Sequence, residues 1–377
     1  IVVEHDKLSK AVERLGQSLH RYGLMSANAP SLPVLRMPVP ENPRPERLDY
    51  QKMRAVYAQL LADLATVEKT LAQMPAGDAK LVIDLFAIRL DLDGNGSAGD
   101  DERLGNVIMS LGMGGRGPGG PRPGGTSAPA DAAEWVVAFD RADALWLRGY
   151  ARLLSAFGEF VLAHDWHESF EATAHLFFKG APDPTNPMAL PSPDNGPLGR
   201  DGRQIADYIA FLHLARWPLA EPARMKAVRA NLKAVVALSR ETWAAVLAET
   251  DDDREWLPGP SQKSRAVTML PVGEEQVKGW LAALDEFDAV LDGRKLLPHW
   301  RHQLGFDLKQ VLEQPRPFDL VLWLTGHAAQ PCLKPGEMIG QDTWRQWQRV
   351  FSGNFLAYAI SFAVIGSRGL DFLSWRT

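Results

Sequence analysis

Apolar residues that recur every three or four positions restrict this chain to a mostly helical fold. Leu8, Val12 and Leu15 have this spacing, which places them on one face of an amphipathic helix. Residues 57–71 repeat the pattern and predict a second long helix. With glycine and proline as end signals, the same reasoning predicts helices in residues 140–181, 204–217, 221–250, 273–292 and 342–365.

Signals for β-strands are few. The best candidate is the apolar run Phe318–Leu324, but no segment beside it carries the turn residues of a hairpin. No internal repeat of about 20 to 50 residues is apparent, which argues against a solenoid. We therefore expect a mostly α fold, an irregular multi-helix bundle with long connectors rich in proline and glycine.

Two segments rich in proline or glycine divide the chain. Six prolines in residues 30–45 favour an extended connector that lies across a surface. Residues 112–125 have no Gly-Lys-Ser/Thr ending, so they predict a flexible linker and not a phosphate-binding loop. We expect N-terminal helices in 1–112, a linker in 113–134 and a main helical domain in 135–377, which leaves open whether the two parts pack as one.

Charge and cysteine content narrow the classes of protein further. The 41 Lys and Arg residues are mixed with 46 Asp and Glu residues, and the net charge is -5, so nucleic acid is not an expected partner. The single cysteine, Cys332, rules out a disulfide-stapled secreted scaffold. The apolar stretch 350–366 is shorter than the roughly 20 residues of a membrane span. We therefore expect no transmembrane helix, and the cytoplasm or a bacterial periplasm as the location.

An acidic loop of defined spacing follows the second predicted helix. Asp91, Asp93 and Asn95 occupy positions 1, 3 and 5, Gly96 occupies position 6, and Glu102 occupies position 12. Ca²⁺ prefers oxygen ligands, and this spacing supplies them around one point, while the glycine permits the sharp turn. The expected ligands are the side chains of Asp91, Asp93, Asn95 and Glu102 and the backbone carbonyl of Ser97.

In this loop and its flanks the chain resembles the EF-hand family. The resemblance implies a calcium loop between two helices. The flanking residues agree with it, because apolar side chains share one face on each side of the loop. They are Leu81, Leu85 and Ile88 before it and Leu104, Val107, Ile108 and Leu111 after it.

The loop also departs from the family pattern. Ala98 occupies position 8, where the family usually has a branched aliphatic residue, and the sequence contains no second loop to pair with it. We expect weak calcium affinity, with a dissociation constant of ~10⁻⁴ to 10⁻³ M. Such a site would be filled in a periplasm or outside the cell, which favours an exported bacterial protein. We expect the ion to be structural, because sensors use paired loops.

A stripe of ionisable residues is a second candidate site. On a continuous helix with about 100° per residue, His164, Glu168, Glu171 and His175 share one face. These residue types coordinate Zn²⁺ or another transition metal, or act as an acid and base pair. The alternative is that they form surface ion pairs or hydrogen-bonded packing.

Two functions follow from these patterns. The first is a calcium-binding helical protein that acts as a binding or accessory subunit of a larger assembly, because the long connectors suit a chain that wraps other protein subunits. The alternative is a metal-dependent enzyme, such as a hydrolase, that uses the stripe from His164 to His175.

Overall fold

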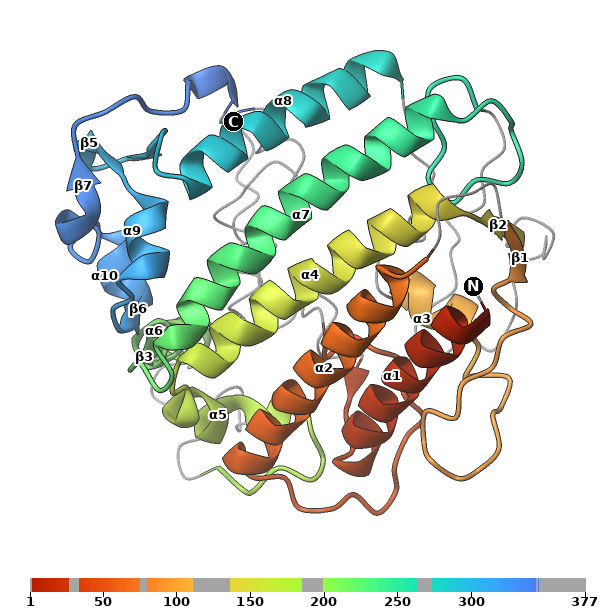
Figure 1. The fold of residues 1–377 in the computed structure, drawn as a ribbon. Helices are drawn as coiled ribbons and strands as arrows, with labels where there is room; N and C mark the ends of the chain where they lie inside the picture. Colours follow the sequence, from red (N-terminus) through yellow and green to blue (C-terminus); the bar gives the residue numbers. More distant parts are fainter. Residues whose placement is uncertain are drawn as a thin grey trace.

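The computed structural model describes residues 2–26, 34–74, 80–110, 136–184, 199–262, 273–343 and 345. Its main feature is a layer of long helices in which each helix packs against the next and neighbours run in opposite directions (Figure 1). Across the layer these are α1 (Val2–Arg21), α2 (Tyr50–Leu71), α4 (Arg141–Ala163), α7 (Ala223–Ala248) and α8 (Glu274–Leu291). The prediction of a mostly helical fold is confirmed.

The helices lie close to their predicted positions. Helices α1 and α2 contain the two N-terminal apolar stripes, and α7 and α8 correspond to the predicted helices 221–250 and 273–292. The helix predicted for 204–217 is α6 (Gly199–Leu214), which ends before the short strand β3 (Arg216–Trp217). The helix predicted for 342–365 lies almost wholly outside the described residues.

Small side chains on α4 allow this helix to pack between its neighbours at the centre of the layer. Its buried residues include Ala151, Ala156 and Gly158. A Cβ atom added at Gly158 would lie 2.9 Å from Cδ2 of Leu61 on α2, closer than packed carbon atoms approach. The absence of a side chain at this position therefore allows α2 and α4 to pack closely.

One apolar cluster joins residues from both sides of the predicted linker. It contains Leu19 of α1, Leu162 of α4 and Phe170 of α5 (His167–Thr173). The N-terminal helices and the main helical domain thus share a core, whereas the linker 113–134 lies outside the described residues.

Helix α4 ends at Ala163, so the continuous helix predicted for 140–181 is wrong. Arg54 of α2 donates hydrogen bonds to the backbone carbonyls of Leu162 and His164, both at 2.8 Å. The last carbonyls of a helix have no partner within it, and here a side chain from a distant segment satisfies two of them. The chain becomes extended at His164, and α5 begins as a separate helix.

Short antiparallel strands complete the fold. Strand β1 (Leu81–Asp84) pairs with β2 (Val136–Phe139), and β3 pairs with β6 (Phe318–Asp319). The third sheet has the order β4 (Leu297–His299), β5 (His302–Phe306) and β7 (Leu333–Lys334). The remaining α-helices of the described residues are α3 (Leu104–Ser110), α9 (Leu308–Glu313) and α10 (Leu320–Leu324).

The strand predicted for Phe318–Leu324 is only partly a strand, and it has the partner that sequence reasoning did not find. Asp319 ends β6 and caps α10, because its side chain accepts a hydrogen bond from the Leu322 N–H at 2.9 Å. This is the usual chemistry of a helix start. The cap explains why an apolar run turns helical after two residues.

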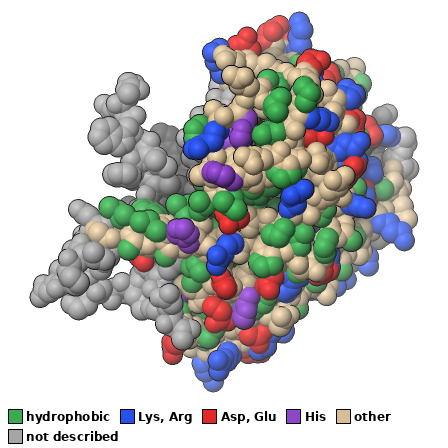
Figure 2. Space-filling model, turned by 90° about the vertical axis from the view of Figure 1, so that its left-hand side faces the viewer, with side chains coloured by type: hydrophobic (Ala, Val, Ile, Leu, Met, Phe, Trp, Pro, Cys, Tyr) green, Lys and Arg blue, Asp and Glu red, His purple; other side chains and the backbone are tan. Residues whose placement is uncertain are grey.

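The surface carries charges of both signs. Figure 2 shows basic and acidic side chains interspersed with apolar ones over the face it presents. Among the described residues, no helix has both the length and the apolar character of a membrane span. The apolar stretch 350–366 lies outside them.

A glycine joins three backbone segments beside α1. The Gly180 N–H donates to the Tyr22 carbonyl at 3.1 Å, and the Gly180 carbonyl accepts from the Leu48 N–H at 2.7 Å. A Cβ atom at this position would lie 2.1 Å from the backbone oxygen of Glu46. Because backbone and not a flexible side chain occupies this space, residue 180 must be glycine for these segments to meet.

Gly180→Ala should therefore destabilise the protein by about 2–3 kcal/mol, the cost of overpacking a fixed backbone contact. Gly149→Ala on α4 is the matched control, because its new methyl group would lie at an ordinary 3.7 Å from Leu238 Cβ. That change should stabilise by about 0.5–1 kcal/mol through helix propensity. Urea unfolding measures both, and equal effects would contradict the contact at Gly180.

Candidate metal centre

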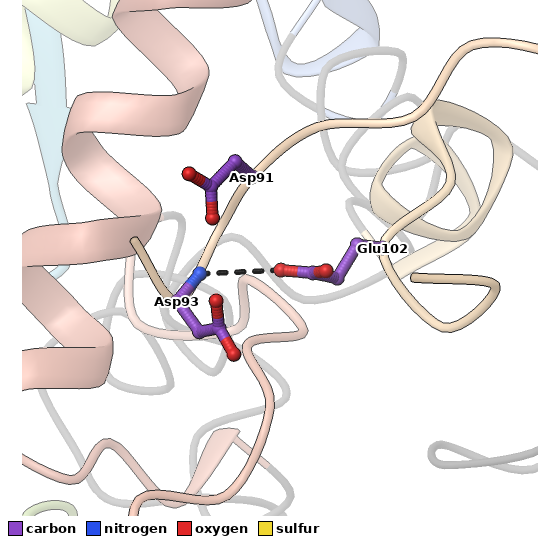
Figure 3. Close-up of side chains that lie close together, drawn as sticks. All are labelled: Asp91, Asp93 and Glu102. Atoms are coloured by element: carbon purple, nitrogen blue, oxygen red, sulfur yellow. Dashed lines mark hydrogen bonds between the residues drawn. The ribbon is translucent and has the colours of Figure 1, made fainter. Parts of the chain in front are cut away.

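The acidic loop brings three of its five predicted ligands together. Each of Asp91, Asp93 and Glu102 places a carboxylate oxygen within 4.8 Å of the others. In Figure 3 the Glu102 side chain extends from the far arm of the loop toward the arm that carries the two aspartates. The three carboxylates therefore face a common space although Asp93 and Glu102 are nine positions apart in the chain.

Backbone N–H groups fix the orientation of these carboxylates. Glu102 is 2% exposed, and its Oε1 accepts hydrogen bonds from Leu92 at 2.8 Å and Asp93 at 3.2 Å, while its Oε2 accepts one from Gly99 at 2.7 Å. The Asp91 side chain likewise accepts hydrogen bonds from two N–H groups within the loop. These hydrogen bonds hold the side chains of Asp91 and Glu102 in place within the loop.

The other two predicted ligands lie at the exposed tip of the loop. The Asn95 Nδ2 group donates to Asp93 at 2.8 Å, and the Asn95 Oδ1 atom accepts from the Ser97 N–H at 2.7 Å. Asn95 therefore contacts Asp93, one of the three clustered carboxylates. Gly96 has φ +83°, a left-handed conformation that glycine adopts at little cost, as predicted for the turn.

The predicted helix before the loop is wrong, because Leu81, Leu85 and Ile88 do not lie on a helix. Leu81 belongs to β1, which pairs with β2 from a distant part of the chain. The Asp84 side chain then accepts hydrogen bonds from the N–H groups of Phe86 at 2.9 Å and Ala87 at 3.1 Å. This local turn separates the strand from the loop.

The predicted helix after the loop is present as α3. Its apolar residues Leu104, Val107 and Ile108 contact the core clusters, whereas Leu111 lies outside the described residues. The two ends of the loop are held together by backbone hydrogen bonds from Leu90 to the Glu102 carbonyl and from Leu104 to the Ile88 carbonyl, each 2.9 Å. The loop is thus closed by strand-like pairing.

Helix α1 supplies contacts that sequence reasoning missed. The Glu13 side chain accepts a hydrogen bond from the Asp91 N–H at 3.3 Å, and Gln17 donates to the Asp91 carbonyl at 2.8 Å. Between them, a Cβ atom at Gly16 would lie only 2.7 Å from Leu92 Cδ2. The three positions share one helix face, so a glycine inside an amphipathic helix was the available signal.

The negative charge of the three loop carboxylates is not balanced by basic side chains. The nearby Arg89 and Arg103 both pair with Asp100, at 2.6 and 2.5 Å. Within the described part of the chain, no ion pair joins a Lys or Arg to Asp91, Asp93 or Glu102. Three clustered carboxylates, one of them buried, are a donor set that fits a hard divalent cation.

The structure does not bring the four residues of the predicted stripe together. His164 is buried at the end of α4, where its Nδ1–H donates to the Phe160 carbonyl at 2.8 Å, and burial lowers the pKa of its imidazole. Glu168 lies on α5 within 3.9 Å of Arg216. Glu171 is also on α5 and pairs with a neighbouring histidine, while His175 lies in the short 3-10 helix that follows. The break after α4 separates His164 from the other three residues, and among the described residues no three of the four place ligand atoms within 4.8 Å of one another.

A second cluster of three carboxylates was not predicted. Asp140, Glu249 and Glu255 also place oxygens within 4.8 Å of one another. Burial, together with these neighbouring carboxylates, raises the pKa of Glu249 to about 7. Lys80 lies 3.9 Å from Glu255 and also pairs with Asp251. This second cluster therefore has a lysine beside it and a carboxyl with a raised pKa, in contrast to the loop.

Comparisons with known proteins add no assignment. No protein-family model matches this chain, and neither does any curated protein or solved structure. The chemistry of the site must therefore be inferred from its own geometry.

The raised pKa of Glu249 predicts a pH-dependent stability. A raised folded-state pKa contributes stability that is complete below the ordinary value of 4.5 and is lost as the pH rises through about 7. Glu249→Gln imitates the protonated side chain, so it should raise the melting temperature at about pH 8 by about 2 °C. The difference should vanish toward about pH 4.5.

The control is Glu241→Gln, which removes an exposed carboxylate from α7, the helix that Glu249 follows. It should show no such difference between acid and alkaline pH. A Glu249→Gln profile that runs parallel to that of the unmodified protein would contradict the assignment.

Proposed function

We propose that this protein binds one Ca²⁺ ion in the loop Asp91–Glu102. The observation that supports the proposal is the convergence of three carboxylates whose charge no basic side chain of the described residues balances. The ligands would be Asp91, Asp93 and Glu102, with the Asn95 side chain and the Ser97 carbonyl completing an oxygen shell. This is the ligand set of an EF-hand-type loop, entered here from a strand.

The buried carboxylate of Glu102 favours a bound ion. A carboxylate that is 2% exposed loses most of its hydration, and a buried charge needs a partner or a metal. The three N–H groups that Glu102 faces stabilise its charge only in part. A divalent cation among the carboxylates would neutralise that charge and those of the two aspartates.

The proposed role of the ion is structural. The loop is held on one side by Glu13 and Gln17 of α1 and continues on the other side into α3. An ion bound between the two arms of the loop would fix α1, the loop and α3 in one arrangement. A single loop with Ala98 at position 8 does not have the paired design of calcium sensors.

We further propose that the protein is exported and acts as a binding or accessory subunit. A single loop with three carboxylates suggests a dissociation constant of ~10⁻⁴ to 10⁻³ M, the range of extracellular modules. Calcium at such concentrations is found in a periplasm or outside the cell. The alternative of an enzyme with Zn²⁺ at His164, Glu168, Glu171 and His175 gains no support from their separated positions.

Calcium should stabilise the folded protein. At about 10 mM Ca²⁺ the gain should be about 1.5–3 kcal/mol, because a ligand present at ten to a hundred times its dissociation constant shifts unfolding by this amount. Asp91→Asn and Glu102→Gln should each abolish the gain by removing a ligating charge. Thermal unfolding with and without Ca²⁺ measures the effect.

The matched control is Asp101→Asn, an exposed residue of the same loop that is not among the proposed ligands. It should retain the full calcium effect. An unmodified protein whose unfolding midpoint does not move at about 10 mM Ca²⁺ would refute the proposal, as would an unchanged calcium response in Asp91→Asn.

A further inference from the structure

A cavity of about 220 Å³ lies in the N-terminal half of the molecule. Helices α1, α2 and α4 form its long walls, and α3, the β1–β2 pair and Trp256 border the rest. Its lining includes Val12, Leu64, Ile108 and Leu147, one from each of the four helices. The three carboxylates of the loop do not line this cavity.

The chemistry of the lining is apolar throughout. Among the described residues that border the cavity none is charged, and the side chains that carry any polar atom are Tyr150, Trp146 and Trp256. Water needs several polar partners to occupy a cavity, and apolar cavities smaller than this one stay dry and bind small hydrocarbons. The lining therefore favours a hydrocarbon occupant over water or a polar metabolite.

The organisation of the core points to the same conclusion. Three apolar clusters border this cavity, and they include Leu60, Val67 and Val137 respectively. Leu60 and Val67 lie on the same helix, two turns apart, yet they belong to different clusters. The N-terminal half thus has a core divided around a space, whereas ordinary protein interiors are close-packed.

The cavity is elongated. On α2 its lining runs from Leu60 to Leu71, a distance of about 16 Å at the rise of an α-helix. On α1 it runs from Leu8 to Leu15, which is about 10 Å. We propose that this cavity binds one unbranched alkyl chain, as found in a fatty alcohol, a fatty acid or a lipid. The proposal does not depend on calcium binding.

The test uses the full chain and the neutral fluorescent probe N-phenyl-1-naphthylamine. The probe should bind saturably at one site and be displaced by dodecan-1-ol, whereas butan-1-ol at the same concentration should leave it bound. Dodecan-1-ol should also raise the melting temperature, because it binds the folded state. Absence of saturable probe binding, or of displacement by dodecan-1-ol, would overturn the proposal.

Variants locate the site. Ala11→Leu and Ala151→Leu place larger side chains in the cavity, so each should weaken probe binding at least about tenfold. Ala283→Leu changes a buried alanine of α8 that does not line the cavity, and its folded form should bind the probe normally. Binding that is unchanged in both cavity variants would overturn the proposal, and if either fails to fold, the other and the dodecan-1-ol melting shift still decide it.

Two further competitors distinguish the sources of the chain. Displacement of the probe by dodecanoate but not by phosphatidylcholine vesicles supports the proposal with a free fatty acid or alcohol as ligand. Displacement by the vesicles as well supports it with a lipid acyl chain. Failure of both competitors and of dodecan-1-ol contradicts it.

Discussion

The arrangement of the described residues depends on the close packing of α4 between its neighbours. Glycine and alanine on α4 allow α2 to approach on one side and α7 on the other. Asp140 and Asp143 form a capping box at its start, and Arg54 satisfies carbonyls at its end. Strand β2 leads into this helix and α5 follows it. The position of α4 therefore determines where β2 ends and where α5 begins.

The two proposed sites both adjoin α1 and α3, but their chemistry is opposite. The loop gathers negatively charged side chains that accept hydrogen bonds from backbone N–H groups, and its tip is exposed. The cavity presents almost nothing but hydrocarbon. Helix α3 joins them, because it begins two residues after Glu102 and its side chains Leu104 and Val107 border the cavity.

Local patterns predicted the helices well, because helical periodicity depends on neighbours along the chain. The carboxylates that gather in the loop were predicted for the same reason, since a twelve-residue spacing fixes their approach. What failed depended on distant partners. Strand β1 needs β2, the break at His164 needs Arg54, and the group of Asp140, Glu249 and Glu255 unites positions that no local pattern connects.

The contact between Gly16 and Leu92 has a consequence for evolution. The side chain of Leu92 occupies the space that a methyl group at position 16 would need, so the two positions share one volume. A larger residue on α1 would be tolerated only with a smaller one in the loop. In sequences descended from the same ancestor, positions 16 and 92 should therefore change together. A larger residue at position 16 of α1 should occur with a smaller residue at position 92 of the loop.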